Sequence, residues 1–80
     1  MEKTISHEIE IFCNNVKWLR MHHKLSKNQM ARIMKISVRS LNKLEQGDIP
    51  WGIGVNAILY TGIYFGVKPA KLLTERLPFD

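Results

Sequence analysis

The chain has 80 residues, a hydrophobic fraction of 45% and a formal net charge of +5, which together predict one folded domain and exclude a disordered chain. Its single cysteine, Cys13, excludes an intrachain disulfide and fits a reducing compartment, while the lack of an apolar run of about 18 residues excludes a membrane-spanning helix. The N-terminal segment MEKTISHEIE is too polar and too acidic for a signal peptide, so we expect a cytoplasmic protein.

The first predicted helix begins near Ser6, a favourable N-cap, and ends with the basic run His22–Lys24. Glu8 and Glu10 in its first turn oppose the positive end of the helix dipole. Apolar residues recur at spacings of three and four: Ile9, Phe12, Val16 and Leu19. This periodicity predicts one buried face, and Cys13 beside it is expected to be a small core residue.

Two adjacent histidines, His22 and His23, raise the alternative of a metal site. Neighbouring residues on a helix point about 100° apart, which is unsuitable for joint chelation. His7 is about four helical turns away, and no Cys/His cluster has ligand spacing. We therefore expect no metal and no cofactor.

The second predicted helix follows Ser26. Gln29 stands three residues after this serine, which is the spacing of a capping box. The inward side chains are expected to be Met30, Ala31 and Met34, with Ile33 at the edge. The outward side chains are expected to be Lys27, Asn28, Arg32 and Lys35. The helix ends at the break Lys35-Ile36-Ser37, where Ile36 is expected to enter the core.

The third predicted helix runs from Val38 to about Gln46, with Ser37 as its N-cap and Gly47 closing it. Leu41 and Leu44 are expected to face inward. Five residues share the opposite face at spacings of three, four and seven: Val38, Arg39, Asn42, Lys43 and Gln46.

The remainder of the chain predicts a loop, two more helices and a tail. Proline and glycine mark residues 48–54 as the loop. The fourth helix is predicted over Val55–Phe65, and Gly66 ends it. Its expected inner stripe is Val55, Ile58, Leu59, Gly62 and Phe65. Gly62 costs about 1 kcal/mol relative to alanine, which predicts a close approach of another helix there.

A last short helix is predicted to begin at Lys68-Pro69, with proline at its first position, and to dock through Leu72 and Leu73. Residues 74–80 are expected to form an extended C-terminal tail. The chain is thus predicted to be a single all-α domain, 1–80, with five helices and no strand.

The basic residues gather in one part of the chain. Between Ile11 and Leu44 there are eight and no acidic residue: Lys17, Arg20, Lys24, Lys27, Arg32, Lys35, Arg39 and Lys43. A region of one charge sign predicts a polyanionic partner. A solvated basic face without a partner remains the alternative.

The segment Leu25–Ala31 (LSKNQMA), followed by Ile36-Ser37, Ser40-Leu41 and Leu44–Gly47 (LEQG), resembles the phage-repressor-type (Xre) helix-turn-helix family. The resemblance continues on both sides of the motif, from Val16 to Leu73. It implies a five-helix lambda-repressor-like fold with the helix-turn-helix at the second and third helices. It also implies a transcriptional regulator, of the repressor kind, that binds double-stranded DNA sequence-specifically.

In that family the recognition helix lies in the major groove, so the resemblance implies base contacts from Val38, Arg39, Asn42 and Lys43. Phosphate contacts are implied for five more residues: Ser26, Lys27, Ser37, Ser40 and Gln46. Solvation is the alternative for the four side chains with implied base contacts.

Two further positions follow from the resemblance. Arg20 and Glu45 occupy the places of a partly buried ion pair that joins the first helix to the third in the family. Lys35 occupies the turn position usually held by glycine. That position tends to need a left-handed backbone, which costs a residue with a Cβ about 1 kcal/mol.

One small domain covers about one half-site, so the resemblance also implies a homodimer. Apolar candidates for its surface are Trp51, Ile53, Tyr60, Ile63, Tyr64, Leu77 and Phe79. A protein-binding module of the same fold, such as an antitoxin that binds a toxin, or an anti-repressor, is the alternative function. An enzyme is not expected, because no nucleophile–base spacing, phosphate loop or paired carboxylate near a histidine is present.

Overall fold

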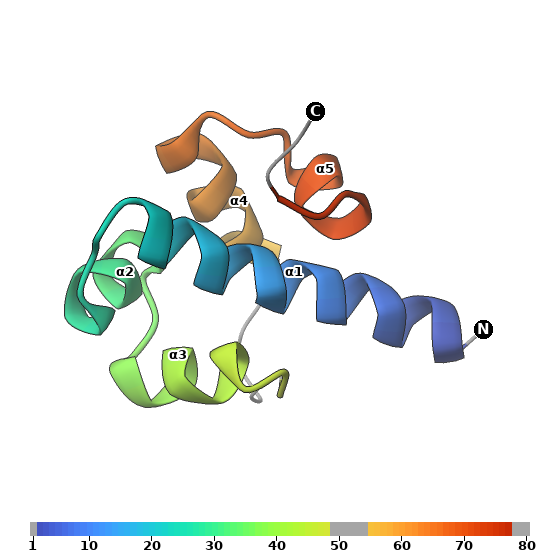
Figure 1. Ribbon diagram of the computed structural model, residues 1–80, viewed down its shortest axis with the longest axis horizontal. Coiled ribbons are helices and arrows are strands. Elements are labelled where there is room, and N and C mark those ends of the chain that lie inside the picture. Colours follow the sequence, from blue (N-terminus) through green and yellow to red (C-terminus); the bar gives the residue numbers. More distant parts are fainter. Residues whose placement is uncertain (1, 49–54, 78–80) are drawn as a thin grey trace.

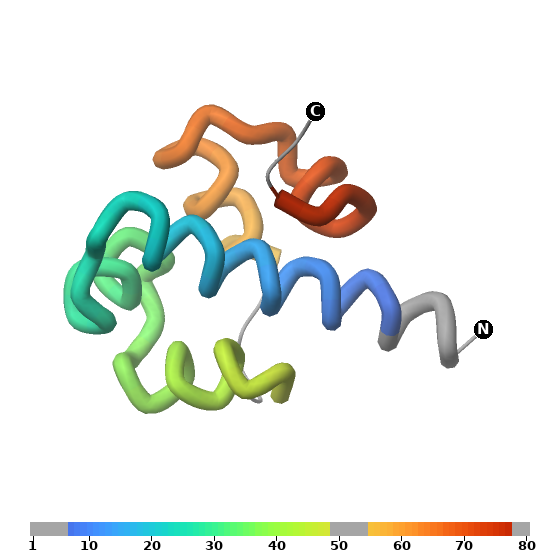
Figure 2. The backbone as a smooth tube through the Cα atoms, viewed as in Figure 1, coloured from blue at the N-terminus to red at the C-terminus, as the bar shows by residue number. Residues whose placement is uncertain are grey.

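Five helices follow one another in the computed structural model, which describes residues 2–48 and 55–77, with side chains from residue 7 onward. They are α1 (Glu2–His22), α2 (Lys27–Met34), α3 (Val38–Glu45), α4 (Val55–Phe65) and α5 (Pro69–Thr74). No strand occurs in these two described ranges, which confirms the all-α, five-helix expectation. Figure 1 shows α1 crossing the molecule between α3 on one side and α4 and α5 on the other, and Figure 2 follows the same path.

The start of α1 differs from the sequence prediction. The helix begins at Glu2, so Ser6 lies inside it and is not its N-cap. The helix ends at His22, and His23 and Lys24 form the turn that follows. Phe12, Val16 and Leu19 are buried as predicted, with Cys13 beside them, and Ile9 is half-buried against the core. Ile11 and Asn15 are buried in addition.

Helices α2 and α3 begin directly after Ser26 and Ser37, the N-cap residues predicted for them. The Ser26 hydroxyl oxygen accepts from the Gln29 backbone N–H at 3.1 Å, and the Gln29 side-chain oxygen accepts from the Ser26 N–H at 2.8 Å. This reciprocal pair is the predicted capping box. The five inward side chains of the two helices are all buried: Met30, Ala31, Met34, Leu41 and Leu44.

The turn between α2 and α3 has the predicted left-handed backbone. Lys35 has φ 59° and ψ 43°, and its N–H donates to the Arg32 carbonyl at 3.2 Å. The following N–H, of Ile36, donates to the Ala31 carbonyl at 3.0 Å. Ile36 is half-buried against the core, as expected.

The limits of α4 match the prediction, and Ile58, Gly62 and Phe65 of its expected inner stripe face the core as predicted. The prediction is wrong for Val55 and Leu59. The buried side is formed by the small residues Ala57, Thr61 and Gly62, while Val55 is 70% exposed and Leu59 is also exposed. A Cβ on Gly62 would lie 2.6 Å from the Val67 carbonyl oxygen, so only glycine allows the connection to α5 to pass this close. The predicted close approach at Gly62 is therefore confirmed, with the α4–α5 connection as its neighbour.

A buried amide fixes the C-terminal segment to α1. The Asn15 Nδ2 group donates to the carbonyl oxygens of Leu72 at 2.9 Å and Glu75 at 2.8 Å. The Asn15 Oδ1 atom accepts from the Leu77 N–H at 2.9 Å. Leu72 is fully buried and Leu73 packs on the core, which confirms the predicted docking of α5. Of the expected tail, Thr74 ends α5 and 78–80 lie outside the described residues, as does most of the predicted loop.

Candidate nucleic-acid interface

The outer surface of α3 carries exposed polar side chains because Leu41 and Leu44 fix the opposite face in the core. Arg39 and Lys43, four residues apart, lie exposed on one side of the helix, and Gln46 is exposed at its C-cap. Neither cation pairs with an acidic side chain among the described residues. Both groups are therefore available to an anion or to hydrogen-bond acceptors in solution.

Val38 departs from the expected outer position. Its side chain is half-buried and packs against the core cluster, although it is the first residue of α3. The apolar side chain gains more from contact with the core than from exposure. The expectation that Val38 lies on the outer face with Arg39 is therefore corrected. Part of the Val38 side chain remains accessible, and the rest stabilises the N-terminal end of α3 by packing on the core.

The two serines at the start of α3 bond to each other. The Ser37 hydroxyl oxygen accepts from the Ser40 N–H at 3.0 Å, and the Ser37 hydroxyl donates to the Ser40 hydroxyl oxygen at 3.0 Å. The donor of Ser37 is thereby used within the protein, whereas the hydroxyl hydrogen of Ser40 is free to turn outward. Of these two serines, Ser40 is the better placed to donate to a phosphate.

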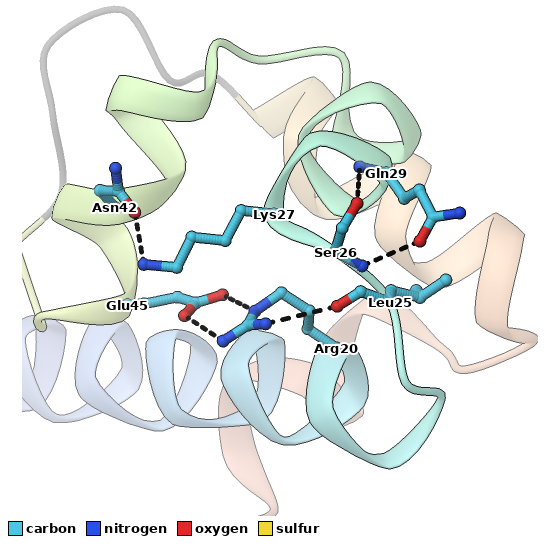
Figure 3. A network of polar contacts seen from close by, with 7 residues as sticks. All are labelled: Arg20, Leu25, Ser26, Lys27, Gln29, Asn42 and Glu45. Carbon is cyan, nitrogen blue, oxygen red and sulfur yellow. Dashed lines mark hydrogen bonds and ion pairs between the residues drawn. The ribbon is translucent and has the colours of Figure 1, made fainter.

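A side-chain contact joins the start of α2 to the middle of α3. The Lys27 ammonium donates to the Asn42 side-chain oxygen at 2.5 Å (Figure 3). Both residues are expected interface residues from separate groups, Lys27 for phosphate and Asn42 for bases. The contact brings the two groups onto one surface. It also leaves the Asn42 amide with only its NH₂ donors directed outward.

The orientation of α3 is fixed from behind by Arg20 on α1. Its guanidinium contacts both carboxylate oxygens of Glu45, Nε to Oε2 at 2.6 Å and Nη2 to Oε1 at 3.0 Å. Its remaining nitrogen, Nη1, donates to the Leu25 carbonyl at 3.3 Å in the α1–α2 turn. Figure 3 shows the pair beside the Lys27–Asn42 contact. The expected ion pair between the first and third helices is present.

The charge carried by α2 and α3 is positive because the one carboxylate within these two helices is already paired. α2 contains no acidic residue, and Glu45 is the only one in α3. Since Glu45 is compensated by Arg20, the ammonium and guanidinium groups of Lys27, Arg39 and Lys43 are not offset within these two helices. Ser26 adds the N-terminus of α2, where N–H groups favour an anion.

The expected dimer residues are divided by the structure. Ile63 is 77% exposed and Tyr64 is also exposed, whereas Tyr60 is half-buried beneath the Lys35 ammonium, 5.3 Å from its ring centroid. Leu77 packs against the core, contrary to its expected exposure. Trp51, Ile53 and Phe79 lie outside the described residues. The sequence prediction missed the exposure of Val55 and Leu59.

The histidines make ring contacts. The imidazole of His22 stacks on Trp18 at 4.3 Å between centroids, and that of His23 contacts Phe65 at 5.0 Å. Within the ranges 2–48 and 55–77, no three His, Cys, Asp or Glu side chains gather where they could bind a metal ion. A search of the same residues finds no helix with both the length and the apolar character needed to cross a membrane.

The side chains on α2 and α3 therefore combine exposed cations, amide donors and a helix N-terminus on one surface. This set can bind an extended anion and form hydrogen bonds to acceptors beside it. Comparisons of the chain with protein-family models, with curated proteins and with solved structures found no match.

Proposed function

We propose that this protein is a sequence-specific double-stranded DNA-binding regulator of transcription, acting as a repressor, in which α2 and α3 form a helix-turn-helix. The observation that carries the proposal is the Lys27–Asn42 contact, which joins the cationic start of α2 to the exposed face of α3. A phosphate-binding group and a base-contacting group are then adjacent, as docking of one helix in the major groove requires.

The base contacts are assigned to α3. Arg39 is exposed and without an acidic partner in the described residues, so its guanidinium is free to make two hydrogen bonds to the O6 and N7 atoms of a guanine. Lys43 lies one turn further on and contacts a second guanine or the adjacent phosphate. Asn42 directs its NH₂ donors toward acceptors in the groove, and the accessible part of Val38 contacts a thymine methyl group.

The phosphate contacts are assigned to the helix ends. Ser26 caps α2 with its side chain, and the N–H groups of Lys27 and Asn28 lie in the first turn, where no intrahelical partner exists. Together with the Lys27 ammonium they form one site for a phosphate. Ser40 and Gln46 supply neutral donors on α3, with Ser37 positioning Ser40.

Selection from a random duplex pool, followed by fluorescence anisotropy on the enriched sequence at several salt concentrations, tests this proposal. We expect enrichment of a short motif and an affinity that falls steeply with salt, because each neutralised phosphate releases counterions. The matched control is Lys17→Gln, since Lys17 is exposed on α1 outside the proposed interface. An affinity indifferent to salt, or a pool that never enriches, would overturn the proposal.

The exposed apolar side of α4 supports a protein partner as well. Val55, Leu59 and Ile63 follow one another at intervals of four residues on a helix that contains no charged residue. We assign this side to a second copy of the chain, because one domain of this size contacts about one half-site and a two-fold dimer contacts two. Figure 1 shows α4 and α3 on opposite sides of α1.

A module that binds a different protein through α4, such as an antitoxin or anti-repressor, is the second candidate function, and the same apolar side favours it. Analytical ultracentrifugation of the purified chain and of Ile63→Glu separates the two. A dimer that becomes a monomer in the variant supports self-association. A monomer in both samples, with a second polypeptide retained only by the unaltered chain during purification, supports the alternative.

A further inference from the structure

A surface groove lies between α2 and α4, on residues to which the proposed function assigns no contact. It has a volume of about 380 Å³ and is lined by Leu25, Gln29, Arg32, Ile33, Lys35 and Tyr64. This volume is within the range of sites that bind one small molecule. We call it the α2–α4 groove.

The polar groups of the α2–α4 groove are hydrogen-bond donors. Gln29 uses its side-chain oxygen in the capping box, which leaves the Nε2 donors, and Figure 3 shows this nitrogen directed away from Ser26. Arg32 and Lys35 add two cationic groups, neither of which forms an ion pair within the described residues. No acidic residue lines the groove. Its complement is therefore an anion.

The walls of the groove are apolar. Leu25 and Ile33 are half-buried and present aliphatic surface, and the Tyr64 ring is oriented by an edge contact with Phe65, 4.9 Å between centroids. A site that combines apolar walls with converging donors favours a ligand with an apolar body and one charged end. A free phosphate or a simple salt ion would leave these walls in contact with water.

The groove spans elements that are already fixed with respect to each other. Gln29, Arg32 and Ile33 share one face of α2 at spacings of three and four. Lys35 is held in the left-handed turn, with its ammonium 5.3 Å from the Tyr60 ring centroid. The backbone positions that carry the donors are thus set before a ligand arrives, which lowers the entropic cost of binding.

We propose that the α2–α4 groove is a binding site for a small amphipathic anion, specifically a carboxylate with an aromatic or branched aliphatic body. The carboxylate lies between Arg32 and Lys35, and the apolar body lies against Leu25, Ile33 and the Tyr64 ring. This site does not depend on DNA binding, because its residues make none of the proposed base or phosphate contacts.

NMR titration of the ¹⁵N-labelled full chain with 3-phenylpropionate tests the proposal, with 3-phenyl-1-propanol, acetate and inorganic phosphate as matched probes. We expect saturable shift changes confined to residues 25–35 and the region of Tyr64, with a Kd on the order of 1 mM. The alcohol lacks the charge and acetate lacks the apolar body, so each is expected to bind about tenfold more weakly. Equal affinity for the alcohol, acetate or phosphate would overturn the proposal.

Single substitutions test whether 3-phenylpropionate binds in the α2–α4 groove. Arg32→Gln removes one cation from an exposed position and is expected to weaken 3-phenylpropionate binding about tenfold. Lys17→Gln removes one cation from α1 outside the groove and is expected to leave binding unchanged. The spectrum of each variant reports its folding directly, and Lys35→Gln provides a second test of the cationic pair. Equal loss in Lys17→Gln, or shift changes spread over the whole surface, would mean that the groove is not the site.

Discussion

The guanidinium of Arg20 on α1 contacts the carboxylate of Glu45 on α3 at two points, 2.6 Å and 3.0 Å, with side chains only 17% and 6% exposed. Two parallel charge-assisted hydrogen bonds fix direction as well as distance. Because Arg20 also bonds the Leu25 carbonyl, one residue fixes both the third helix and the turn that leads into the second. The contact therefore joins α1 to α3 and to the turn before α2.

The contribution of this pair to stability is measurable by a double-mutant cycle. Arg20→Ala, Glu45→Ala and the double variant are compared by urea denaturation, and we expect a coupling free energy of about 1–3 kcal/mol. The Arg76–Glu10 pair is the matched control: its atoms lie 3.4 Å apart, and its side chains are 52% and 64% exposed. Exposed pairs contribute little, so its coupling is expected below about 0.5 kcal/mol. Equal couplings would show that the Arg20–Glu45 geometry is not stabilising.

Local chemistry made α2 and α3 predictable. Ser26 and Gln29 encode a helix start within four residues, and the two halves of that signal meet as expected. The left-handed turn at Lys35 followed from the resemblance to a known motif. The Arg20–Glu45 pair followed from that resemblance alone, because nothing in the spacing of the two residues indicates contact.

The exposure of Val55 and Leu59 on α4 could not be predicted, for a physical reason. The sequence of α4 contains no charged residue, so no polar face marks the solvent side. The fully buried positions are Ala57, Thr61 and Gly62, and at Gly62 the Val67 carbonyl oxygen leaves no room for a Cβ. The hydrogen bonds of Asn15 could not be predicted from the sequence either, because its partners are backbone atoms more than fifty positions away.

Asn15 supplies the next prediction. Replacement by leucine leaves the Leu72 and Glu75 carbonyls and the Leu77 N–H without their partner. We expect Asn15→Leu to lower the free energy of unfolding by about 3 kcal/mol. Asn14→Leu is the matched control, because Asn14 is exposed on the same helix. Urea denaturation measures both, and a loss in Asn15→Leu no greater than in Asn14→Leu would contradict the structural role.

Backbone strain at Lys35 predicts that the relative stability of glycine and alanine variants is opposite at Lys35 and at Lys17. At φ 59°, Lys35→Gly is expected to be about 1 kcal/mol more stable than Lys35→Ala, since both lose the ammonium and only alanine keeps a Cβ. At Lys17, inside α1, the order reverses and alanine is more stable than glycine by about 1 kcal/mol. Thermal unfolding of the four variants tests this. The same order at both positions would rule out a left-handed turn at Lys35.

Cys13 makes stability depend on pH in the alkaline range. Burial, with a smaller contribution from the charge of Asp48, raises the pKa of the Cys13 thiol from its ordinary 9.0 to about 11. In the unfolded chain the thiol ionises above pH 9.0, whereas in the folded protein it stays protonated up to about pH 11. The stabilisation is therefore complete below pH 9.0 and is lost as the pH rises toward 11.

Urea denaturation of the unaltered chain and of Cys13→Ala at neutral pH and at about pH 10.5 measures this effect. The unaltered chain is expected to lose about 2 kcal/mol more than the variant over this interval. The difference between the two chains removes the contribution of lysine and tyrosine titration. Parallel losses would mean that the folded thiol titrates normally.

The last prediction distinguishes the residues proposed to contact bases from those proposed to contact phosphates. Arg39→Ala removes a side chain free to pair with one guanine, so it is expected to cost about 1–3 kcal/mol on the selected sequence and to abolish preference at one base pair. Lys27→Ala removes a phosphate contact, so it is expected to weaken all sequences alike and to reduce the salt slope by about one.

Because the Lys27 ammonium also contacts Asn42, the variant Asn42→Ala completes the set. If Lys27 acts only on phosphate, Lys27→Ala leaves the base preferences intact, while Asn42→Ala changes the preference at the base pair next to that of Arg39. Affinities for the selected duplex and its single-base variants, measured at two salt concentrations, distinguish these outcomes. The reverse pattern, with Lys27→Ala altering base preference and Arg39→Ala weakening all sequences equally, would place α2 in the groove and contradict the assignment of α3.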